Sequence, residues 1–423
     1  MNPKMVLENG LRVVSQTMPQ TQSVSVCLFV AVGSRYETIP QSGISHFLEH
    51  ILFRGTERRP TSFHISEEIE RVGGMLNGGT DKETTVFWAK VASSHFSLAL
   101  DVLSDMLINS KFSEDDIEKE RQIIIEELKM NFDDPSSRVG MVIENLLWEG
   151  NALGRDVLGT AKSVRAIGRS QLVDFHSKRY TPSSTLIAIA GGVEHSVMVN
   201  EVKRCFGKWR NASASVARGF SPYKERHAEK VKVEKRDIEQ THICMALHGV
   251  SLFDPRRYAL DLLNIVLGSG MSCRLFREVR DRLGLAYSVQ SFIEHLHDVG
   301  SLVVYAGVDS SKTELAIRSI FGELARFRDV PIPSDELHKA KEMTKGQLAL
   351  RLEDSRNMAG WLGGQEIHSG KILSLEEVST LIDAVRAEDI MSVARDLIVE
   401  SGIRLAVVGP RQHENLLELI TGS

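Results

Sequence analysis

Residues 85–94 read TVFWAKVASS, and residues 301–311 read SLVVYAGVDSS. Both segments are β-branched and aromatic, as strands are, and both end in Ser-Ser before apolar residues at helical spacing. Each is followed by a serine-capped, acidic helix start, SEDDI at 113–117 and SDEL at 334–337. Each half then closes with an apolar strand running into a glycine turn, LIAIAGGV at 186–193 and IRLAVVGP at 403–410. Three matching features in the same order predict a duplicated domain.

The repeat indicates an α+β protein of two structurally related domains, each a mainly antiparallel sheet covered by helices. Between Trp209 and Lys230 the chain is small and polar at 211–219 and charged at 222–229, which is typical of a linker. We therefore expect one domain over residues 1–212, a linker over 213–229 and a second domain over 230–423.

Composition excludes several classes of protein. Of 423 residues, 42% are hydrophobic and 25% are charged, so a packed core is expected rather than disorder. With 51 Lys and Arg against 56 Asp and Glu, the net charge is -5, which disfavours a nucleic-acid partner. The apolar runs are strand-sized, so no membrane span is expected. No secretory signal is seen, and four dispersed cysteines without a CxxC pair indicate reduced thiols and a cytoplasmic location.

The segment HFLEH, residues 46–50, is the sharpest chemical signal. On a helix, residues four apart share a face, so His46 and His50 can present two imidazoles to one metal ion. Glu49 borders that face, where a carboxylate can take a proton from the attacking water. This is the H-x-x-E-H order of inverted zinc peptidases, and zinc suits imidazole and carboxylate ligands.

A catalytic zinc site needs a third protein ligand. The expected helix over 113–130 offers Glu120 and Glu127, which lie two turns apart on one face. Glu118 and Glu126 are further carboxylates of this helix, and most helical glutamates simply face water. The pattern by itself does not choose between Glu126 and Glu127.

These motifs together resemble the pitrilysin family of zinc peptidases, in particular the group of the catalytic subunit of mitochondrial processing peptidase and its bacterial relatives. The resemblance extends over most of the chain and rests on four segments: HFLEH at 46–50, GGMLNGGTDKETT at 73–85, ERQIIIEELKM at 120–130 and GSGMSCRLFREVRDRLGLAYSV at 268–289. It implies the processing-peptidase-like metallohydrolase fold, which LuxS shares.

The resemblance also implies roles for residues of the first half. One zinc ion per chain would be held by His46, His50 and Glu127, with Glu120 as a supporting carboxylate and Glu49 activating water. Residues 73–80 would form an edge strand to which an extended substrate adds by backbone hydrogen bonds. Asn77 matches the family asparagine expected to hold the substrate backbone.

The sequence departs from the family at that strand. Gly78 stands where the family usually has alanine, and Gly79 follows it. Two glycines make an edge strand more flexible, which bears on substrate registration and leaves the chemistry unaffected.

In the second half, Arg280 and Tyr287 flank the turn LGLA at 283–286. The resemblance places such a pair across the cleft from the metal, where a guanidinium and a phenol can hold a substrate carbonyl and its developing oxyanion. The counterpart of the HFLEH helix, YALDLLNIV at 258–266, has no histidine pair. One half is therefore expected to bind metal and the other to confine substrate.

The sequence thus favours a zinc endopeptidase that acts on unfolded or extended peptides inside a clamshell chamber, as a homodimer or with a related chain. A non-catalytic scaffold or partner subunit of the same fold, such as a core protein of the cytochrome bc1 complex, is the competing interpretation. Such subunits typically lose motif residues, whereas this chain keeps them. A metal-binding module of unknown reaction is a third possibility.

Overall fold

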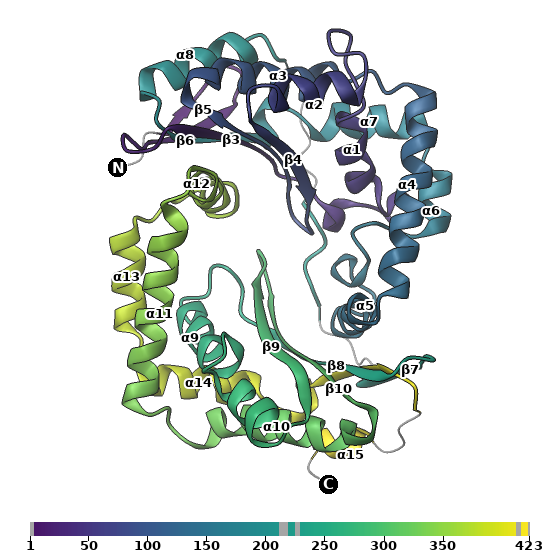
Figure 1. Ribbon diagram of the computed structural model, residues 1–423, viewed down its shortest axis with the longest axis vertical. Coiled ribbons are helices and arrows are strands. Elements are labelled where there is room, and N and C mark those ends of the chain that lie inside the picture. Colours follow the sequence, from purple (N-terminus) through teal and green to yellow (C-terminus); the bar gives the residue numbers. More distant parts are fainter. Residues whose placement is uncertain (1–3, 211–218, 225–228, 412–415, 422–423) are drawn as a thin grey trace. The chain divides into compact units, whose positions relative to one another are not determined.

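The computed structural model describes residues 4–210, 219–224, 229–411 and 416–421. They form two compact units, which we call the first and second unit (Figure 1). The first comprises Met1–Leu128, Arg155–Phe220 and Ala349–Ser374, and the second comprises Lys129–Gly154, Ser221–Leu348 and Leu375–Ser423.

A six-stranded sheet organises the first unit, in the order β1-β2-β6-β3-β5-β4. The strands are β1 Lys4–Val6, β2 Arg12–Thr17, β3 Ser23–Val30, β4 Met75–Thr80, β5 Thr85–Ala92 and β6 Thr185–Gly191. The helices are α1 Ile44–Leu52, α2 Ser62–Glu70, α3 Phe96–Asn109, α4 Glu114–Asp133, α6 Ala161–Ala166, α7 Arg169–Arg179, α8 His195–Phe206 and α12 Ser355–Ser369, and α4 runs past the end of the unit.

A five-stranded sheet organises the second unit, in the order β7-β11-β8-β10-β9. The strands are β7 Val231–Lys235, β8 Gln240–Gly249, β9 Ala286–His295, β10 Gly300–Asp309 and β11 Arg404–Gly409. The helices are α5 Pro135–Leu147, α9 Arg257–Gly268, α10 Thr313–Asp329, α11 Ser334–Leu352, α13 Leu375–Ala384, α14 Ala387–Leu397 and α15 Leu416–Thr421, with a π-helical turn, η6, over Phe276–Arg282.

The two sheets confirm the predicted relationship between the domains. Apart from β1, their strand orders are identical when each strand is paired with its counterpart in chain order. Each sheet is antiparallel except for one parallel pair, β2 with β6 and β7 with β11. The expected strands and helices around the motifs are also present, among them α1 over the HFLEH segment and α4 over the glutamate-rich segment.

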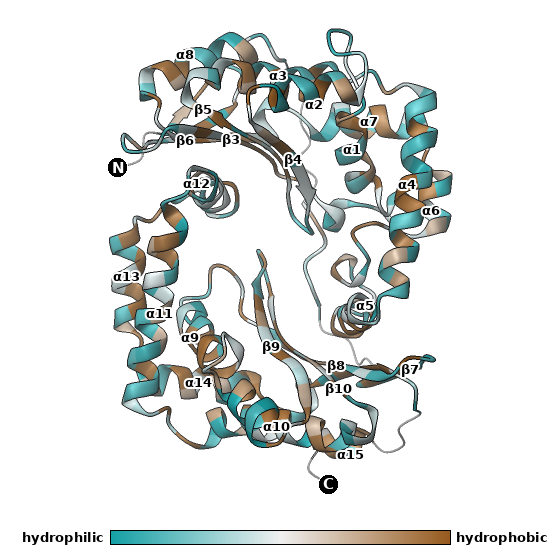
Figure 2. Cartoon of the chain, viewed as in Figure 1, coloured by the Kyte–Doolittle hydropathy of each residue, from teal (hydrophilic) through white to brown (hydrophobic). Residues whose placement is uncertain are grey.

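The inner strands of each sheet are largely buried on both faces, which explains why they are almost continuously apolar. In the first unit every residue of β6 is buried. One face packs on α1, α3 and α8, and α12 covers β2, β3 and β6 on the other. Gly363 permits this approach, because a Cβ there would lie 2.0 Å from the Phe29 ring. Figure 2 marks the apolar stretches of α3 and β5.

Helix α5 corresponds in the second unit to α12 in the first, because it covers one face of the sheet by packing on β8 and β11. The compact units are therefore discontinuous in sequence, since α5 lies before residue 212 and α12 after residue 230. The domains expected from the sequence are continuous stretches of chain. They place α5 in the first domain and α12 in the second, whereas the compact units place them the other way round. The expected linker, 213–229, falls largely on residues 211–218 and 225–228, outside the described residues.

Candidate metal centre

Helix α1 positions the HFLEH segment. Its buried side, formed by Ile44, Phe47, Leu48 and Ile51, packs in the core of the first unit, and His46, Glu49 and His50 border the other side. Just before the helix, Gly43 has a φ of +91°, and a Cβ there would lie 2.4 Å from the Leu158 carbonyl oxygen. Only glycine therefore fits this turn, and the turn sets where the helix begins.

A buried carboxylate caps α1. Glu37 is 6% exposed, and its two oxygens accept hydrogen bonds of 2.8 Å from the backbone amides of Gly43 and Ser45. Amides in the first turn of a helix have no partner within the helix, and an acidic group there is favourable. Burial nevertheless raises the pKa of Glu37 to about 7, against the two amide bonds. The cap thus orients the helix that presents both histidines.

This capping carboxyl predicts a pH dependence of stability. As pH rises from 4.5 towards about 7, the unfolded chain releases the Glu37 proton while the folded chain retains it. Deprotonation therefore favours unfolding, and this group should lower the free energy of unfolding by roughly 2–3 kcal/mol across that range. Urea unfolding of the metal-free protein at pH 5 and pH 8, for wild type and Glu37→Gln, measures the effect, because their difference isolates this group.

The exposed Glu57→Gln variant is the matched control and should keep the wild-type pH dependence. An equal change of stability with pH in wild type and Glu37→Gln would contradict the predicted role of Glu37.

Helix α4 carries two glutamates that lie close to the histidines of α1. Ile117, Ile124 and Ile125 bury one side of this helix. Glu120 is only 3% exposed and Glu127 is half-buried, whereas Glu126 is exposed. The two carboxylates that face α1 are therefore the pair seven residues apart.

His46, His50 and Glu127 converge on one point. The Nε2 atoms of the two histidines are 3.2 Å apart, and Glu127 Oε2 lies 3.7 Å from the first and 3.8 Å from the second. In the described ranges, this is the group of His, Cys, Asp and Glu side chains whose ligand atoms lie close enough to share an ion. Atoms bound tetrahedrally to zinc lie about 3.3–3.5 Å apart, so the three residues fit a zinc ion.

Glu120 lies behind His50, one of the three candidate ligands. Its Oε2 is 2.7 Å from His50 Nδ1, and its Oε1 is paired with the Arg54 guanidinium. A carboxylate on the outer nitrogen of a ligand histidine fixes the ring orientation and directs the other nitrogen towards the metal. Glu120 is thus placed to support the metal ligand rather than to act as one.

The ionisation of these groups follows from their surroundings. Burial and the neighbouring His50 lower the pKa of His46 to about 3, so its ring is neutral, as a metal ligand must be. Burial alone would lower the pKa of His50, but the Glu120 carboxylate beside it raises the pKa. Burial raises the pKa of Glu127, although the neighbouring His50 acts to lower it. The centre therefore joins a neutral imidazole to a tightly paired histidine and carboxylate.

Glu49 lies between α1 and β4. Its Oε2 accepts a 2.7 Å hydrogen bond from Thr80 Oγ1, and burial raises its pKa while that hydrogen bond opposes the rise. A half-buried carboxylate with a raised pKa, next to a candidate metal centre, is suited to exchange protons with a reacting group.

Strand β4 is at one edge of the first sheet and pairs with β5 from Met75↔Lys90 to Thr80↔Thr85. Asn77 and Gly79 are exposed on it, and Asn77 Oδ1 accepts a hydrogen bond from the Gly78 amide. A Cβ at Gly79 would meet open space, whereas a Cβ at Gly78 would lie 3.2 Å from Glu49 Cγ. The predicted substrate strand is thus an edge strand in contact with Glu49.

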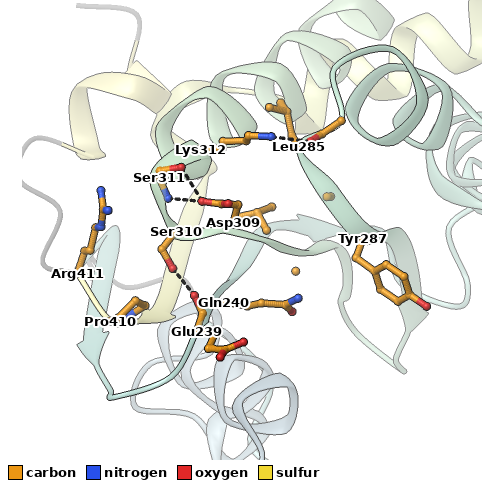
Figure 3. A pocket seen from close by; sticks show the side chains of 14 residues that line it. Glu239, Gln240, Leu285, Tyr287, Asp309, Ser310, Ser311, Lys312, Pro410 and Arg411 are labelled. Atoms are coloured by element: carbon orange, nitrogen blue, oxygen red, sulfur yellow. Dashed lines mark hydrogen bonds between the residues drawn. The ribbon is translucent and has the colours of Figure 1, made fainter.

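Arg280 and Tyr287 belong to the second unit. Tyr287 is 78% exposed near the start of β9, and the Arg280 guanidinium lies 5.4 Å from the centre of its ring. Tyr287 also lines a hollow of about 710 Å³. Figure 3 shows the opposite wall of this hollow, where Ser310 and Ser311 are hydrogen-bonded to Glu239 and Asp309. Arg280 and Tyr287 are therefore close to one another, and both are exposed.

The second unit does not repeat the metal ligands in its described residues. Helix α9 is the counterpart of α1 and has no histidine pair. In α11, the counterpart of α4, Ala340 and Gln347 stand where α4 has Glu120 and Glu127. His295 binds the Val250 carbonyl and Asp261 instead.

Three residues that the structure places at this centre were not among those predicted from the sequence. Arg54 lies four residues after His50, just past the end of α1, so this spacing could have suggested it. Thr80 lies two residues after Gly78 on β4, so the two residues share a face of the strand. This spacing does not reveal which side chain Thr80 contacts. Glu37 gives no local signal, because its contact with the start of α1 depends on the path of the intervening loop.

The fold has two α+β units, and in the first unit two histidines and a glutamate converge on one point. These features are typical of proteins with a hydrolytic metal centre. The family model described as Insulinase (Peptidase family M16) matches residues 12–161, and the model described as Peptidase M16 inactive domain matches residues 166–344. An uncharacterised zinc protease of Streptomyces coelicolor is 36% identical over 96% of this chain and 88% of its own length. YmxG of Bacillus subtilis, also named an uncharacterised zinc protease, is 35% identical over 95% of this chain and 97% of its own length. The chain therefore belongs to the M16 peptidase family.

Solved structures show the same fold. A protease from Helicobacter pylori aligns with a TM-score of 0.92 at 22% identity, covering 96% of this chain and 99% of its own. A chain of Complex III2 from Candida albicans aligns with a TM-score of 0.84 at 20% identity and covers both chains fully. No helix in the described ranges combines the length and apolar character needed to cross a membrane.

Proposed function

We propose that this chain is a zinc-dependent endopeptidase that hydrolyses unfolded or extended peptides. The observation that supports this most directly is the convergence of His46, His50 and Glu127 next to the Glu49 carboxylate. The names of the homologous zinc proteases agree with it. When bound, zinc supplies Lewis-acid chemistry that polarises a carbonyl and acidifies water.

In this proposal each residue near the metal has a distinct task. Glu49 takes a proton from the attacking water and delivers it to the leaving amine. Glu120 holds His50 in the orientation that binds the metal. An extended peptide adds to the free edge of β4 by backbone hydrogen bonds, and Asn77, Gly78 and Gly79 form that edge.

We further propose that Arg280 and Tyr287 hold the substrate carbonyl as negative charge develops on it. Their mutual contact and the exposure of Tyr287 agree with a role in binding. Residues 1–212 would then contain the catalytic domain and residues 230–423 the substrate-confining domain. The family model that matches residues 166–344, a range that overlaps the latter domain, is described as an inactive domain.

The remaining parts of the proposal concern assembly and place of action. Two chains, either identical or related, would enclose a chamber that admits peptides and excludes folded proteins. We place the enzyme in the cytoplasm and closest to the processing-peptidase group of its family. A scaffold or partner subunit is the alternative, since a chain of this fold occurs in Complex III2. The complete ligand set in this chain favours the enzyme.

Metal removal tests the proposal. We expect the purified chain to contain about one zinc ion and to cleave quenched fluorescent peptides, to lose cleavage after chelation, and to regain it with zinc. Chelation should also lower the midpoint of thermal unfolding, because a metal that binds only the folded state stabilises it. Zinc content and cleavage are measured on the same sample.

A folded control protein containing the same peptide sequence should resist cleavage. Bound zinc without cleavage of any extended peptide, by this chain alone or together with a related chain, would support the scaffold or metal-binding alternative instead.

A further inference from the structure

Strand β4 contacts helix α1 through alternate residues. Along β4, Met75, Asn77 and Gly79 are exposed, while Leu76, Gly78 and Thr80 are partly buried. Gly78 and Thr80 both meet Glu49 of α1. The face of β4 that carries Gly78 and Thr80 therefore contacts Glu49 of the candidate catalytic centre.

The contact from Thr80 is directional. Its hydroxyl lies 2.7 Å from Glu49 Oε2 and donates to it, because an ionised carboxylate only accepts hydrogen bonds. Within the described part of the chain, Glu49 Oε1 accepts no hydrogen bond and is left for another proton donor. A hydroxyl on one oxygen thus fixes the rotation of the carboxylate and keeps the other oxygen available.

The surroundings hold the hydroxyl in place. Thr80 pairs with Thr85 of β5, and the Thr85 hydroxyl donates to the buried Val32 carbonyl. Threonine is β-branched, so few χ1 rotamers are open to it in a strand. The other carboxylate oxygen lies near Gly78, where an added Cβ would lie 3.3 Å from Oε1 and would crowd it.

We infer that Thr80 is a positioning residue for the general base: its hydroxyl orients the Glu49 carboxylate for proton transfer without contacting metal or substrate. This rests on the proposed peptidase function. It also means that the strand proposed to bind the peptide is the strand that orients the base, so substrate docking and proton transfer depend on one structural element.

Two variants of Thr80 test this inference. Thr80→Val removes the hydroxyl but keeps the branched shape and strand preference. We expect it to lower kcat about 10- to 100-fold, the range found for outer-sphere partners, with unchanged KM, zinc content and thermal midpoint. Thr80→Ser keeps the hydroxyl and should retain most of the wild-type kcat.

A double variant separates orientation of Glu49 from any other role. In the Glu49→Gln background the base is absent, so adding Thr80→Val should change kcat less than about twofold. Independent, multiplying losses would overturn the inference. So would loss of zinc, a raised KM at unchanged kcat, or wild-type kcat in Thr80→Val. Inactive wild type, or fully active Glu49→Gln, would count against the proposed function, and those results differ from every outcome that tests Thr80 alone.

Discussion

Glu49→Gln is expected to keep its zinc and to turn over peptides about 10²- to 10⁴-fold more slowly than wild type, the usual contribution of a general acid–base group. Glutamine has nearly the same shape as glutamate and can still accept the Thr80 hydrogen bond. It cannot take up a proton at neutral pH, so both proton transfers assigned to this side chain are lost. The loss should appear in kcat rather than in peptide binding.

Stopped assays at high enzyme concentration, with zinc content and thermal unfolding measured on the same preparation, check this prediction. Glu126→Gln is the matched control, because Glu126 is an exposed glutamate of α4 and has no assigned role in the chemistry. Full turnover by Glu49→Gln would exclude Glu49 as the general base. Loss of zinc from this variant would show that the side chain serves metal binding instead.

Glu127→Gln is expected to lose zinc. The carboxylate offers the proposed third ligand atom, 3.7 Å and 3.8 Å from the two histidine nitrogens, and a neutral amide is a much weaker ligand. Because outer-sphere partners alone are worth about 10- to 100-fold in metal affinity, we expect the loss of a direct ligand to exceed about 100-fold. Peptide cleavage should disappear with the metal and return in part at high zinc concentration.

Competition with a zinc-binding dye measures this change in affinity. Glu126→Gln again provides the comparison, since it removes a carboxylate from the adjacent residue of the same helix. Unchanged zinc affinity in Glu127→Gln, together with a large loss in Glu126→Gln, would reverse the assignment of the third ligand.

Much of this centre could be predicted from local sequence. The HFLEH spacing places two imidazoles on one helix face, since helical periodicity is set by the backbone alone. The same periodicity paired Glu120 with Glu127. It could not choose Glu127 over Glu126, because neighbouring residues on a helix differ by about 100° in direction, and the direction of the metal depends on how α4 packs against α1. Family resemblance selected Glu127, and in the structure Glu127 faces the histidines.

Other contacts became visible only in three dimensions. The hydrogen bond from Thr80 to Glu49, the ion pair of Arg54 with Glu120 and the cap that Glu37 forms on α1 join groups whose meeting depends on strand pairing, helix packing or loop path. Polar side chains of these types are common, and their sequence context does not reveal their partners.

The order of strands and helices, the internal repeat and the two-histidine helix were determined by the sequence itself, because alternation, helical spacing and turn residues act over a few positions. Which sheet each helix covers was decided by tertiary structure. The apolar faces of α5 and α12 require burial but do not specify a partner, and each packs on the sheet of the unit formed mainly by the other half of the chain. Tertiary structure also decided which glutamate faces the two histidines and which hydroxyl contacts Glu49, since a side chain's surroundings depend on elements distant in sequence.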